Sequence, residues 1–488
     1  MTSKDGLIHM DTFRHACAPL CATLAFATVG IMHTGAGAHA PSQTRPAPVT
    51  SIKPRVIRLT VPMDAEARGG IIAADVDGDG RMDLVVTAPN HIGAYRLDGK
   101  QIWSVATDVR VSAGSSENTG LPGHHAPGVQ VADIDGDRRP EVLHLDQDSR
   151  VYIRDGKNGA VKRTVRIAHP EGSERWEHLA VANLRGRGDR DIVLQTTNAR
   201  GYRVGSFVSA YAVEKLDGPP LWSTRGFGAL AHGPFRLADL DGDGRDEICG
   251  YTILGPDGKR TDWQYPPIEK SRAGGASFHI DSVFIADVRP DVPGLEVILL
   301  EEGRNYTACV SKAQGVLWWT TKGREEPQNA AVGEFDLTRP GLETWCRSRF
   351  NEHQKPWVLD AHGQVIARYN MDDVAPAGWT LSGVEAIFTI DWTGGPVQLA
   401  LAKERHKEGD VALFEPMTGR FVSVFRAQAH RVYAADVVGD WREEVIVVNR
   451  DTIEVYENPE RNPNPRRPRL WTQQHYRRNK MNWNYYSP

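Results

Sequence analysis

The chain has 488 residues, of which 40% are hydrophobic and 25% are charged, with 47 glycines and 30 prolines. These globular proportions exclude a wholly disordered or fibrous protein. There are 58 Lys and Arg and 62 Asp and Glu, so the net charge is −4. This balance argues against a general nucleic-acid binder, because such proteins usually carry a basic excess.

The first forty residues have the layout of a secretory signal peptide. Two basic residues precede an apolar stretch at residues 16–32, and Ala38-His39-Ala40 supplies a small-residue cleavage site. The apolar stretch is shorter than the ~20 residues that a membrane-spanning helix needs. We therefore expect residues 1–40 to be removed and residues 41–53 to form a flexible linker. The mature protein is then secreted or periplasmic and has no membrane span.

Removal of residues 1–40 would leave three of the five cysteines, Cys249, Cys309 and Cys346. Three cysteines cannot form a disulfide framework. Each of them lies in an apolar run typical of a β-strand. The sequence therefore predicts buried free thiols.

An acidic segment of nine residues recurs along the chain. Asp75-Val-Asp-Gly-Asp-Gly-Arg-Met-Asp83 returns closely in residues 133–141 and 239–247. More divergent copies begin at Asn183, Asp287, Glu334, Asp391 and Asp436. The first and eighth copies start 361 residues apart, so the seven intervals average about 52 residues. Periods of this size are typical of propeller blades with about four short strands each.

The residues between the acidic segments support this interpretation. Apolar strands precede and follow each acidic loop, a third strand ends in an Asp-Gly turn, and a fourth contains a tryptophan such as Trp103 or Trp222. We therefore predict an all-β protein, an eight-bladed β-propeller over residues 54–488. We expect the terminal segments to close the last blade.

Carboxylates at alternate positions, with glycines that allow a tight turn, provide oxygen ligands for a hard cation, and Ca²⁺ is the usual one. Strands rather than helices flank these loops, which argues against an EF-hand. Arg185 and Arg187 replace ligands in the third copy, so we expect no metal there. We expect the ions to stabilise the first hairpin of each blade. The predicted ligands form three sites: Asp75, Asp77, Asp79 and Asp83; Asp133, Asp135, Asp137 and Glu141; Asp239, Asp241, Asp243 and Glu247.

The opposite rim of the predicted propeller carries a different set of residues. The loops that enter the first strands contain His or Asn, and those that join the second and third strands contain mainly Arg and Lys. Such a surface predicts an anionic ligand. The candidate catalytic residues are His124, His125, His232, His279, Arg304 and Tyr306. The candidate substrate-binding residues are His178, Asn329, Arg349, Lys403, Arg405 and His430.

Three stretches of the second half resemble a known enzyme family. Residues 439–444, Gly-Asp-Trp-Arg-Glu-Glu, resemble a motif of the rhamnogalacturonan lyases of polysaccharide lyase family eleven. His279-Ile-Asp281 with residues 286–297, and the tail from Tyr476 to Tyr485, are similar to further motifs of that family. The acidic loops of the first half resemble the more general FG-GAP or VCBS type. The resemblance implies an eight-bladed propeller that performs calcium-assisted β-elimination on the rhamnose–galacturonate backbone of pectin.

The sequence thus predicts a secreted, monomeric polysaccharide lyase that acts on an acidic, uronate-containing polysaccharide similar to rhamnogalacturonan. A cation must neutralise the uronate carboxylate, a base must remove the C5 proton, and an acid must protonate the leaving oxygen. Arg304, a histidinium or Ca²⁺ suits the first task, and His232, His279 or Tyr306 suits the second.

Two alternatives remain open at this point. The first is a non-catalytic carbohydrate-binding or adhesion propeller, since the same fold serves both purposes. The second is a quinone-dependent dehydrogenase, for which the cysteines offer no suitable arrangement.

Overall fold

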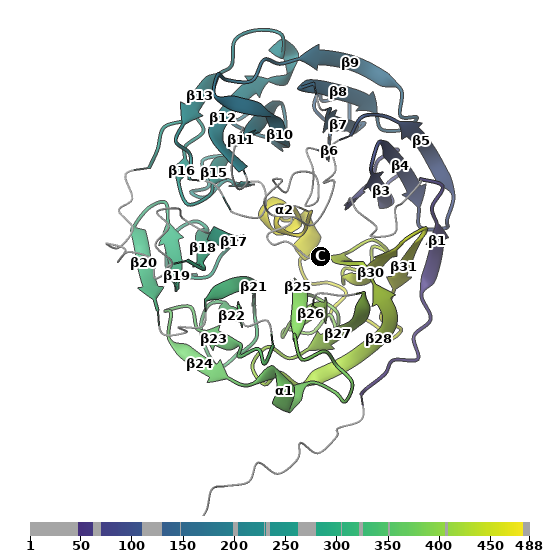
Figure 1. The fold of residues 1–488 in the computed structure, drawn as a ribbon, viewed down its shortest axis with the longest axis vertical. Helices are drawn as coiled ribbons and strands as arrows, with labels where there is room; N and C mark the ends of the chain where they lie inside the picture. Colours follow the sequence, from purple (N-terminus) through teal and green to yellow (C-terminus); the bar gives the residue numbers. More distant parts are fainter. Residues whose placement is uncertain are drawn as a thin grey trace, which may run out of the picture. The chain divides into compact units, whose positions relative to one another are not determined.

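Eight antiparallel sheets follow one another along the chain in the computed structural model of the protein (Figure 1). They confirm the predicted eight-bladed β-propeller. The described residues belong to one unit, residues 44–488. The structure describes residues 47–61, 70–109, 129–146, 148–198, 204–228, 230, 235–261, 280–303, 305–321, 326–349, 352–405 and 408–481. The predicted signal peptide, residues 1–40, lies outside these ranges.

The first four blades are each made of consecutive strands, with the first strand innermost. Blade 1 contains β2 (Ile71–Ala74), β3 (Asp83–Ala88), β4 (His91–Arg96) and β5 (Gln101–Ala106). Blade 2 contains β6 (Val129–Ala132), β7 (Glu141–Leu145), β8 (Arg150–Asp155) and β9 (Val161–Arg166). Blade 3 contains β10 (Ser173–Ala182), β11 (Asp191–Asn198), β12 (Val204–Ala212) and β13 (Trp222–Arg225), with the 3-10 turn η2 (Val213–Lys215). Blade 4 contains β14 (Arg236–Ala238), β15 (Glu247–Cys249) and β16 (Ile253–Leu254).

The second half repeats this order. Blade 5 contains β17 (Ile280–Ala286), β18 (Glu296–Glu301), β19 (Tyr306–Ser311) and β20 (Gly315–Thr320). Blade 6 contains β21 (Pro327–Gly333), β22 (Glu343–Ser348), β23 (Trp357–Leu359) and β24 (Val365–Arg368), followed by the short helix α1 (Met371–Val374). Blade 7 contains β25 (Val384–Ile390), β26 (Leu399–Glu404), β27 (Gly409–Phe414) and β28 (Phe421–Ala429). Blade 8 contains β29 (Arg431–Ala435), β30 (Glu444–Asn449) and β31 (Thr452–Tyr456).

The position of a strand within its blade decides its composition. Every residue of β3, β18 and β22 is buried, because both faces of these second strands pack against neighbouring blades. Such strands read as apolar runs rather than as an alternation. The outer strand β9 has no buried residue. The three cysteines lie on buried strands as free thiols, as the sequence predicts.

A tryptophan on the outer strand of one blade packs on a turn of the next blade. The indole N–H of Trp222 donates to the carbonyl of Pro256 at 2.8 Å, and that of Trp318 donates to Ala361 at 2.8 Å. Each ring covers a glycine with positive φ, Gly258 or Gly363, at which a Cβ would come within 2.5–2.6 Å of the indole. The recurrence of Asp-Gly turns and tryptophans in the sequence thus reflects contacts between blades.

The N-terminal strand closes the ring. β1 (Arg55–Arg58) pairs antiparallel with β31, so the last sheet has the order β1-β31-β30-β29. The Arg55 guanidinium also lies 2.6 Å from the Glu457 carboxylate, just after β31. Opening the ring therefore requires the two ends of the domain to separate.

The C-terminal segment occupies the middle of the ring. It forms the 3-10 turn η3 (Leu470–Thr472) and the helix α2 (Gln474–Met481), which lies among the innermost strands β2, β14, β17 and β29 (Figure 1). Arg478 lies 2.8 Å from Asp246 of blade 4, and Asn479 donates to the Ile285 carbonyl of blade 5 at 2.5 Å. Among the described residues no helix is long and apolar enough to cross a membrane.

The packing between blades predicts a difference between two similar glycine substitutions. Gly258→Ala should lower the free energy of unfolding by about 2–4 kcal/mol, because the new methyl group collides with Trp222 as well as opposing a φ of +77°. Gly99→Ala, in the equivalent turn of blade 1, meets no atom within 4 Å and should cost only about 1 kcal/mol. Urea denaturation followed by tryptophan fluorescence measures both. Equal losses would show that the indole contact does not matter.

Candidate functional site

All eight acidic loops join the first strand of a blade to the second. For example, the loop that starts at Asp75 lies between β2 and β3, and the loop that starts at Asp436 lies between β29 and β30. Because the strands are antiparallel, these loops share one rim of the propeller. We call this side the acidic rim and the other side the opposite rim.

In seven of the eight blades the last carboxylate of the acidic loop holds the loop closed. In blade 4, Glu247 accepts a hydrogen bond of 2.9 Å from the backbone N–H of Leu240, the second residue of the loop. We call this hydrogen bond the loop clasp. The same bond recurs at Asp83, Glu141, Asp191, Glu296, Glu343 and Glu444, at 2.7–3.1 Å. The clasp is internal to the chain and needs no metal ion.

Blade 7 has Leu399 where the other loops end in a carboxylate, so it has no loop clasp. Its loop is joined to the next blade by a second kind of hydrogen bond, from the first residue of one loop to the eighth residue of the next, which also joins Asn183 to Asp246 and Glu334 to Gln398. Glu443 of blade 8 accepts a hydrogen bond of 2.8 Å from the backbone N–H of Asp391. Glu443 also accepts from the Tyr476 hydroxyl at 2.8 Å and lies 3.2 Å from the Lys480 ammonium, both on α2. The C-terminal helix is therefore tied to the closing blade at the acidic rim.

Burial changes the protonation of the clasp carboxylates. It raises the pKa of Asp83, Glu247, Glu296 and Glu343 to about 7. The cause is desolvation, since these side chains are at most 1% exposed and a buried carboxylate loses its hydration. The loops therefore favour a proton or a cation at these positions.

Three loops gather carboxylates closely enough to hold a metal ion. The oxygens of Asp75, Asp77 and Asp83 lie within 4.8 Å of one another, as do those of two equivalent groups: Asp133, Asp135 and Glu141; Asp239, Asp241 and Glu247. A set of carboxylate oxygens fits a hard cation such as Ca²⁺. These residues are three of the four predicted ligands of each loop, at its first, third and ninth positions.

The fifth-position aspartates are not part of these clusters. Asp79 pairs with Arg81 at 2.8 Å, Asp243 accepts from the Arg245 side chain at 3.1 Å, and Asp137 accepts the backbone N–H of Arg139 at 2.8 Å. In blade 3 the Arg185 side chain lies 2.6 Å from the clasp carboxylate of Asp191, in keeping with the expected absence of a metal ligand set there.

The candidate catalytic residues lie mostly outside the part of the chain that the structure describes. This applies to His124, His125, His232, His279 and Arg304. Tyr306 is described: it is the first residue of β19, at the opposite rim, and is 4% exposed. The assignment of these residues remains a prediction.

The six candidate substrate-binding residues are all described, and five of them are buried. The exposed fractions are 2% for His178, 3% for Asn329, 0% for Lys403, 3% for Arg405 and 7% for His430. Burial, with the charges of Arg236 and Arg175, lowers the pKa of His178 to about 3, so this imidazole is neutral at physiological pH. In the state described, these side chains are enclosed in the blades.

Arg405 belongs to a buried network between blades 6 and 7, together with Arg347, which the sequence did not single out. Arg347 lies 3.1 Å from one oxygen of Glu385, and Arg405 lies 3.5 Å from the other. Both guanidinium groups also donate to the side-chain oxygen of Gln328. The Lys403 ammonium donates to the Glu404 carbonyl at 2.9 Å. Because breaking a buried ion pair is costly, this network holds the second strands of both blades in fixed positions at the opposite rim.

Arg349 presents its charge to solvent. Its side chain is 58% exposed and follows β22 at the opposite rim. The guanidinium lies 2.9 Å from the buried carboxylate of Glu302 and 3.4 Å from the exposed carboxylate of Glu326. The Arg405 side chain donates to the Arg349 carbonyl at 3.2 Å, so the buried network also supports the backbone of this residue. An exposed guanidinium held on one side can bind a carboxylate of a ligand.

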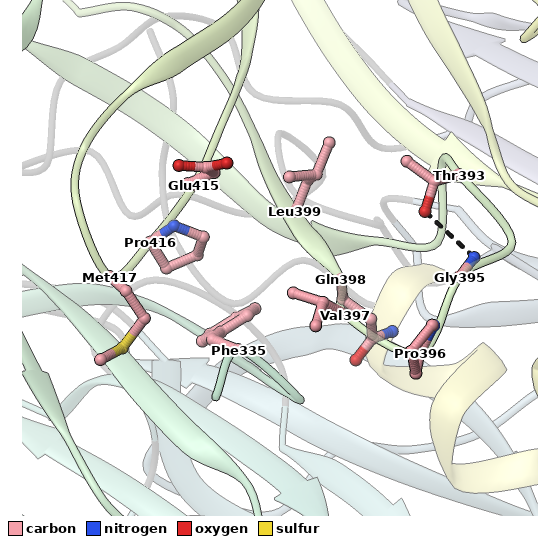
Figure 2. A pocket seen from close by; sticks show the side chains of 10 residues that line it. All are labelled: Phe335, Thr393, Gly395, Pro396, Val397, Gln398, Leu399, Glu415, Pro416 and Met417. Carbon is pink, nitrogen blue, oxygen red and sulfur yellow. Dashed lines mark hydrogen bonds between the residues drawn. The ribbon is translucent and has the colours of Figure 1, made fainter. Parts of the chain in front are cut away.

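A separate cavity of about 420 Å³ lies at the acidic rim between blades 6 and 7 (Figure 2). Phe335, Val397, Leu399 and Met417 face it, and Glu415 lies at its edge. None of the described residues that line it is basic. It therefore suits an apolar group rather than an acidic polysaccharide.

Sequence reasoning missed two features of these surfaces. The network around Glu385 was not predicted, because nothing in a single sequence pairs Arg347 with a residue of the next blade. The clasp could have been found, because an acidic residue ends seven of the eight loops at nearly constant spacing.

Comparisons with known proteins agree with the propeller fold and with the acidic repeats. Residues 223–487 match the model of the C-terminal domain of rhamnogalacturonan lyase family 11, and residues 75–144 match an FG-GAP-like repeat. The chain is 26% identical to the rhamnogalacturonan endolyase YesW of Bacillus subtilis and 22% identical to the exolyase YesX of the same organism. In both cases 78% of this chain is covered, and it spans 65% of YesW and 68% of YesX.

Solved structures show the same fold. The crystal structure of YesW superposes with a TM-score of 0.58 over 88% of this chain and 81% of that one, at 20% identity. The crystal structure of YesX gives 0.61 over 88% of this chain and 80% of that one, at 19% identity.

The raised pKa of Glu343 predicts how stability depends on pH. A carboxyl group whose pKa is about 7 in the folded protein, above its usual 4.5, stabilises the fold at low pH and loses that contribution as the pH rises through 7. Glu343→Gln keeps a neutral acceptor for the clasp. With a chelator present it should therefore be about 1–3 kcal/mol more stable than the natural protein at pH 8 and similar to it at pH 4.

Urea denaturation across this pH range tests the expectation. Glu352→Gln, an exposed carboxylate of the same blade, serves as the control and should change little at either pH. A Glu343→Gln protein that is less stable at pH 8 would show that the carboxylate is ionised and stabilising in the fold.

Proposed function

This chain belongs to rhamnogalacturonan lyase family 11, and on that premise we propose that it is a secreted or periplasmic polysaccharide lyase that cleaves a rhamnose- and uronate-containing polymer by β-elimination. The observation that carries the proposal is the family match over residues 223–487, more than half of the chain. The two curated relatives are named as an endolyase and an exolyase of rhamnogalacturonan. The mode of cleavage is therefore one of the quantities to measure.

The position of α2 supports a site on the opposite rim. Its partners Asp246 and Glu443 belong to acidic loops, so the helix occupies the end of the central channel at the acidic rim. A polymer then approaches from the other end. Arg349 presents its guanidinium on that side, where a uronate carboxylate would bind it.

The partners of Arg349 suggest how the carboxylate is received. Glu302 is 4% exposed and lies close to the guanidinium, whereas Glu326 is 49% exposed and lies farther away. An exposed ion pair costs little to exchange. A uronate carboxylate would therefore replace Glu326, while Glu302 keeps the guanidinium in position.

The reaction needs three groups at the uronate. Pairing of its carboxylate with a guanidinium makes the C5 proton more acidic, because the developing enolate charge is stabilised. A base then removes that proton, a C4–C5 double bond forms, and the bond from C4 to the glycosidic oxygen breaks. The leaving oxygen takes a proton from an acid or from water. For the base we propose His232 or His279, with Tyr306 as an alternative, and Arg304 as a second cation.

We propose calcium as the metal of the acidic loops in blades 1, 2 and 4. The three carboxylate clusters supply oxygen ligands of the type that Ca²⁺ prefers. A bound ion would neutralise the clasp carboxylates and stabilise the first hairpin of each blade. No step of the elimination is assigned to these ions.

Ultraviolet absorbance of the unsaturated uronate product tests the proposed reaction. The protein is incubated with calcium and with rhamnogalacturonan, polygalacturonate, ulvan and gum arabic in turn. We expect the absorbance to grow with rhamnogalacturonan, and product sizing then separates endo from exo cleavage. A flat trace with every polymer, together with retardation in an affinity gel, would instead identify a carbohydrate-binding propeller.

A substitution tests the role of Arg349. Arg349→Ala should lower kcat/KM on the responding polymer by about 10- to 100-fold, with much of the change in KM, because the ligand carboxylate loses its partner. Arg139→Ala, an exposed arginine at the acidic rim, should leave kcat/KM unchanged. Equal kcat/KM for Arg349→Ala and the natural protein would show that Arg349 does not bind the substrate.

A further inference from the structure

A lysine side chain occupies the acidic cluster of blade 4. The ammonium nitrogen of Lys312 lies 2.6 Å from an oxygen of Asp241 and 2.6 Å from an oxygen of Glu247. These are two of the three carboxylates that come together in this loop. Lys312 follows β19 and so belongs to blade 5, and its side chain is 20% exposed. The contact therefore also links blade 5 to blade 4.

The cluster of blade 2 contains a lysine in the same relation. The ammonium nitrogen of Lys162 lies 2.9 Å from an oxygen of Asp135 and 2.6 Å from an oxygen of Glu141. In both loops the carboxylates are the third and ninth residues of the acidic segment. The two lysines come from different places, since Lys162 lies on β9 of blade 2 itself. Lysines from different places in the fold thus pair with the carboxylates at the same two loop positions.

Blade 1 has a different arrangement. Arg96 pairs with Asp77 and lies 3.5 Å from Asp79, the fifth residue of the loop. Its guanidinium therefore bridges the third and fifth positions, whereas the lysines of blades 2 and 4 bridge the third and the ninth.

The position of each lysine nitrogen conflicts with that of a metal ion. Ca²⁺ binds oxygens at 2.3–2.6 Å, and the nitrogen of Lys312 lies 2.6 Å from two of the same oxygens. A divalent ion on this pair of oxygens would lie within a few ångströms of the ammonium group, where two positive charges repel strongly. The ion and the ammonium group cannot use the same two oxygens together.

We propose that Lys162 and Lys312 are resident cations of the acidic loops in blades 2 and 4. Their ammonium groups hold the third and ninth carboxylates together in the metal-free protein. A divalent cation binds in these loops only after the ammonium group has moved out, so each lysine weakens the affinity of its loop for calcium. This inference rests on the calcium binding proposed above.

Calcium titration of the full-length protein tests the inference. The natural protein, Lys312→Met, Lys312→Arg and Lys162→Met are freed of metal with a chelator, dialysed and titrated with CaCl₂ by calorimetry, and equilibrium dialysis counts the sites. Each Met variant should bind calcium about tenfold more tightly at one site, because a competing charge is gone. Lys312→Arg keeps the charge and should resemble the natural protein. Lys259→Met, an 84% exposed lysine paired only with Asp257 among the ion pairs described, is the matched control.

Thermal unfolding gives a second readout that does not depend on activity. In chelator, Lys312→Met should melt below Lys259→Met, because Asp241 and Glu247 lose their cation, and calcium should raise its Tm by more than it raises that of the natural protein. Unchanged or weaker calcium affinity in both Met variants would overturn the inference while calcium binding stands. Absence of calcium binding in every protein, variants included, would overturn both proposals.

Discussion

The loop clasp is the interaction on which the rest of this molecule depends. In seven of the eight blades a buried carboxylate accepts a backbone N–H from the second residue of its acidic loop, and so fixes the first hairpin of the blade. A hydrogen bond to a charged group contributes about 1.5–3 kcal/mol, but burial of the charge opposes it. Burial raises the pKa of Glu296 and Glu343 to about 7, so the cost of burying the charge exceeds the stabilisation by the hydrogen bonds. Each clasp therefore needs a proton or a cation close to it.

The blades meet this need in different ways. Blades 1, 2 and 4 gather carboxylate clusters that suit a metal ion, whereas blade 3 places Arg185 on its clasp carboxylate. In blades 7 and 8 the cations pair with a different carboxylate: the first aspartates of the loops, Asp391 and Asp436, pair with Arg467 and Arg469 of the C-terminal segment. That segment therefore supplies charge to the closing blades as well as the helix that occupies the channel.

The sequence predicts the features that repeat from blade to blade, and it does not predict contacts that occur only once. The acidic segment, the Asp-Gly turn and the tryptophan recur in register, so the number of blades, the shared rim of the loops and the three carboxylate clusters could be derived from them. The pairing of Glu443 with Lys480, the helix in the middle of the ring and the burial of Lys403 and Arg405 could not, because each depends on contacts between segments far apart in the chain. The fifth-position aspartates fit the repeat, yet they turn to a neighbouring arginine or backbone N–H instead of joining the clusters. Spacing alone does not decide between these partners.

The C-terminal helix makes the two ends of the ring different from each other. Without it, the two ends of the channel would differ only in their loops. With Arg478 and Lys480 bound to Asp246 and Glu443, the end at the acidic rim is occupied by protein, and a polymer cannot thread through the ring. On the proposed function, a polysaccharide would then lie across the opposite rim or enter it by one end. Carboxylates of the acidic rim are meanwhile engaged by loop clasps and by Lys and Arg side chains. The guanidinium of Arg349 lies at the opposite rim on a backbone that the buried network of blades 6 and 7 supports, and the proposed binding of a uronate carboxylate by Arg349 would depend on rigid support of this kind.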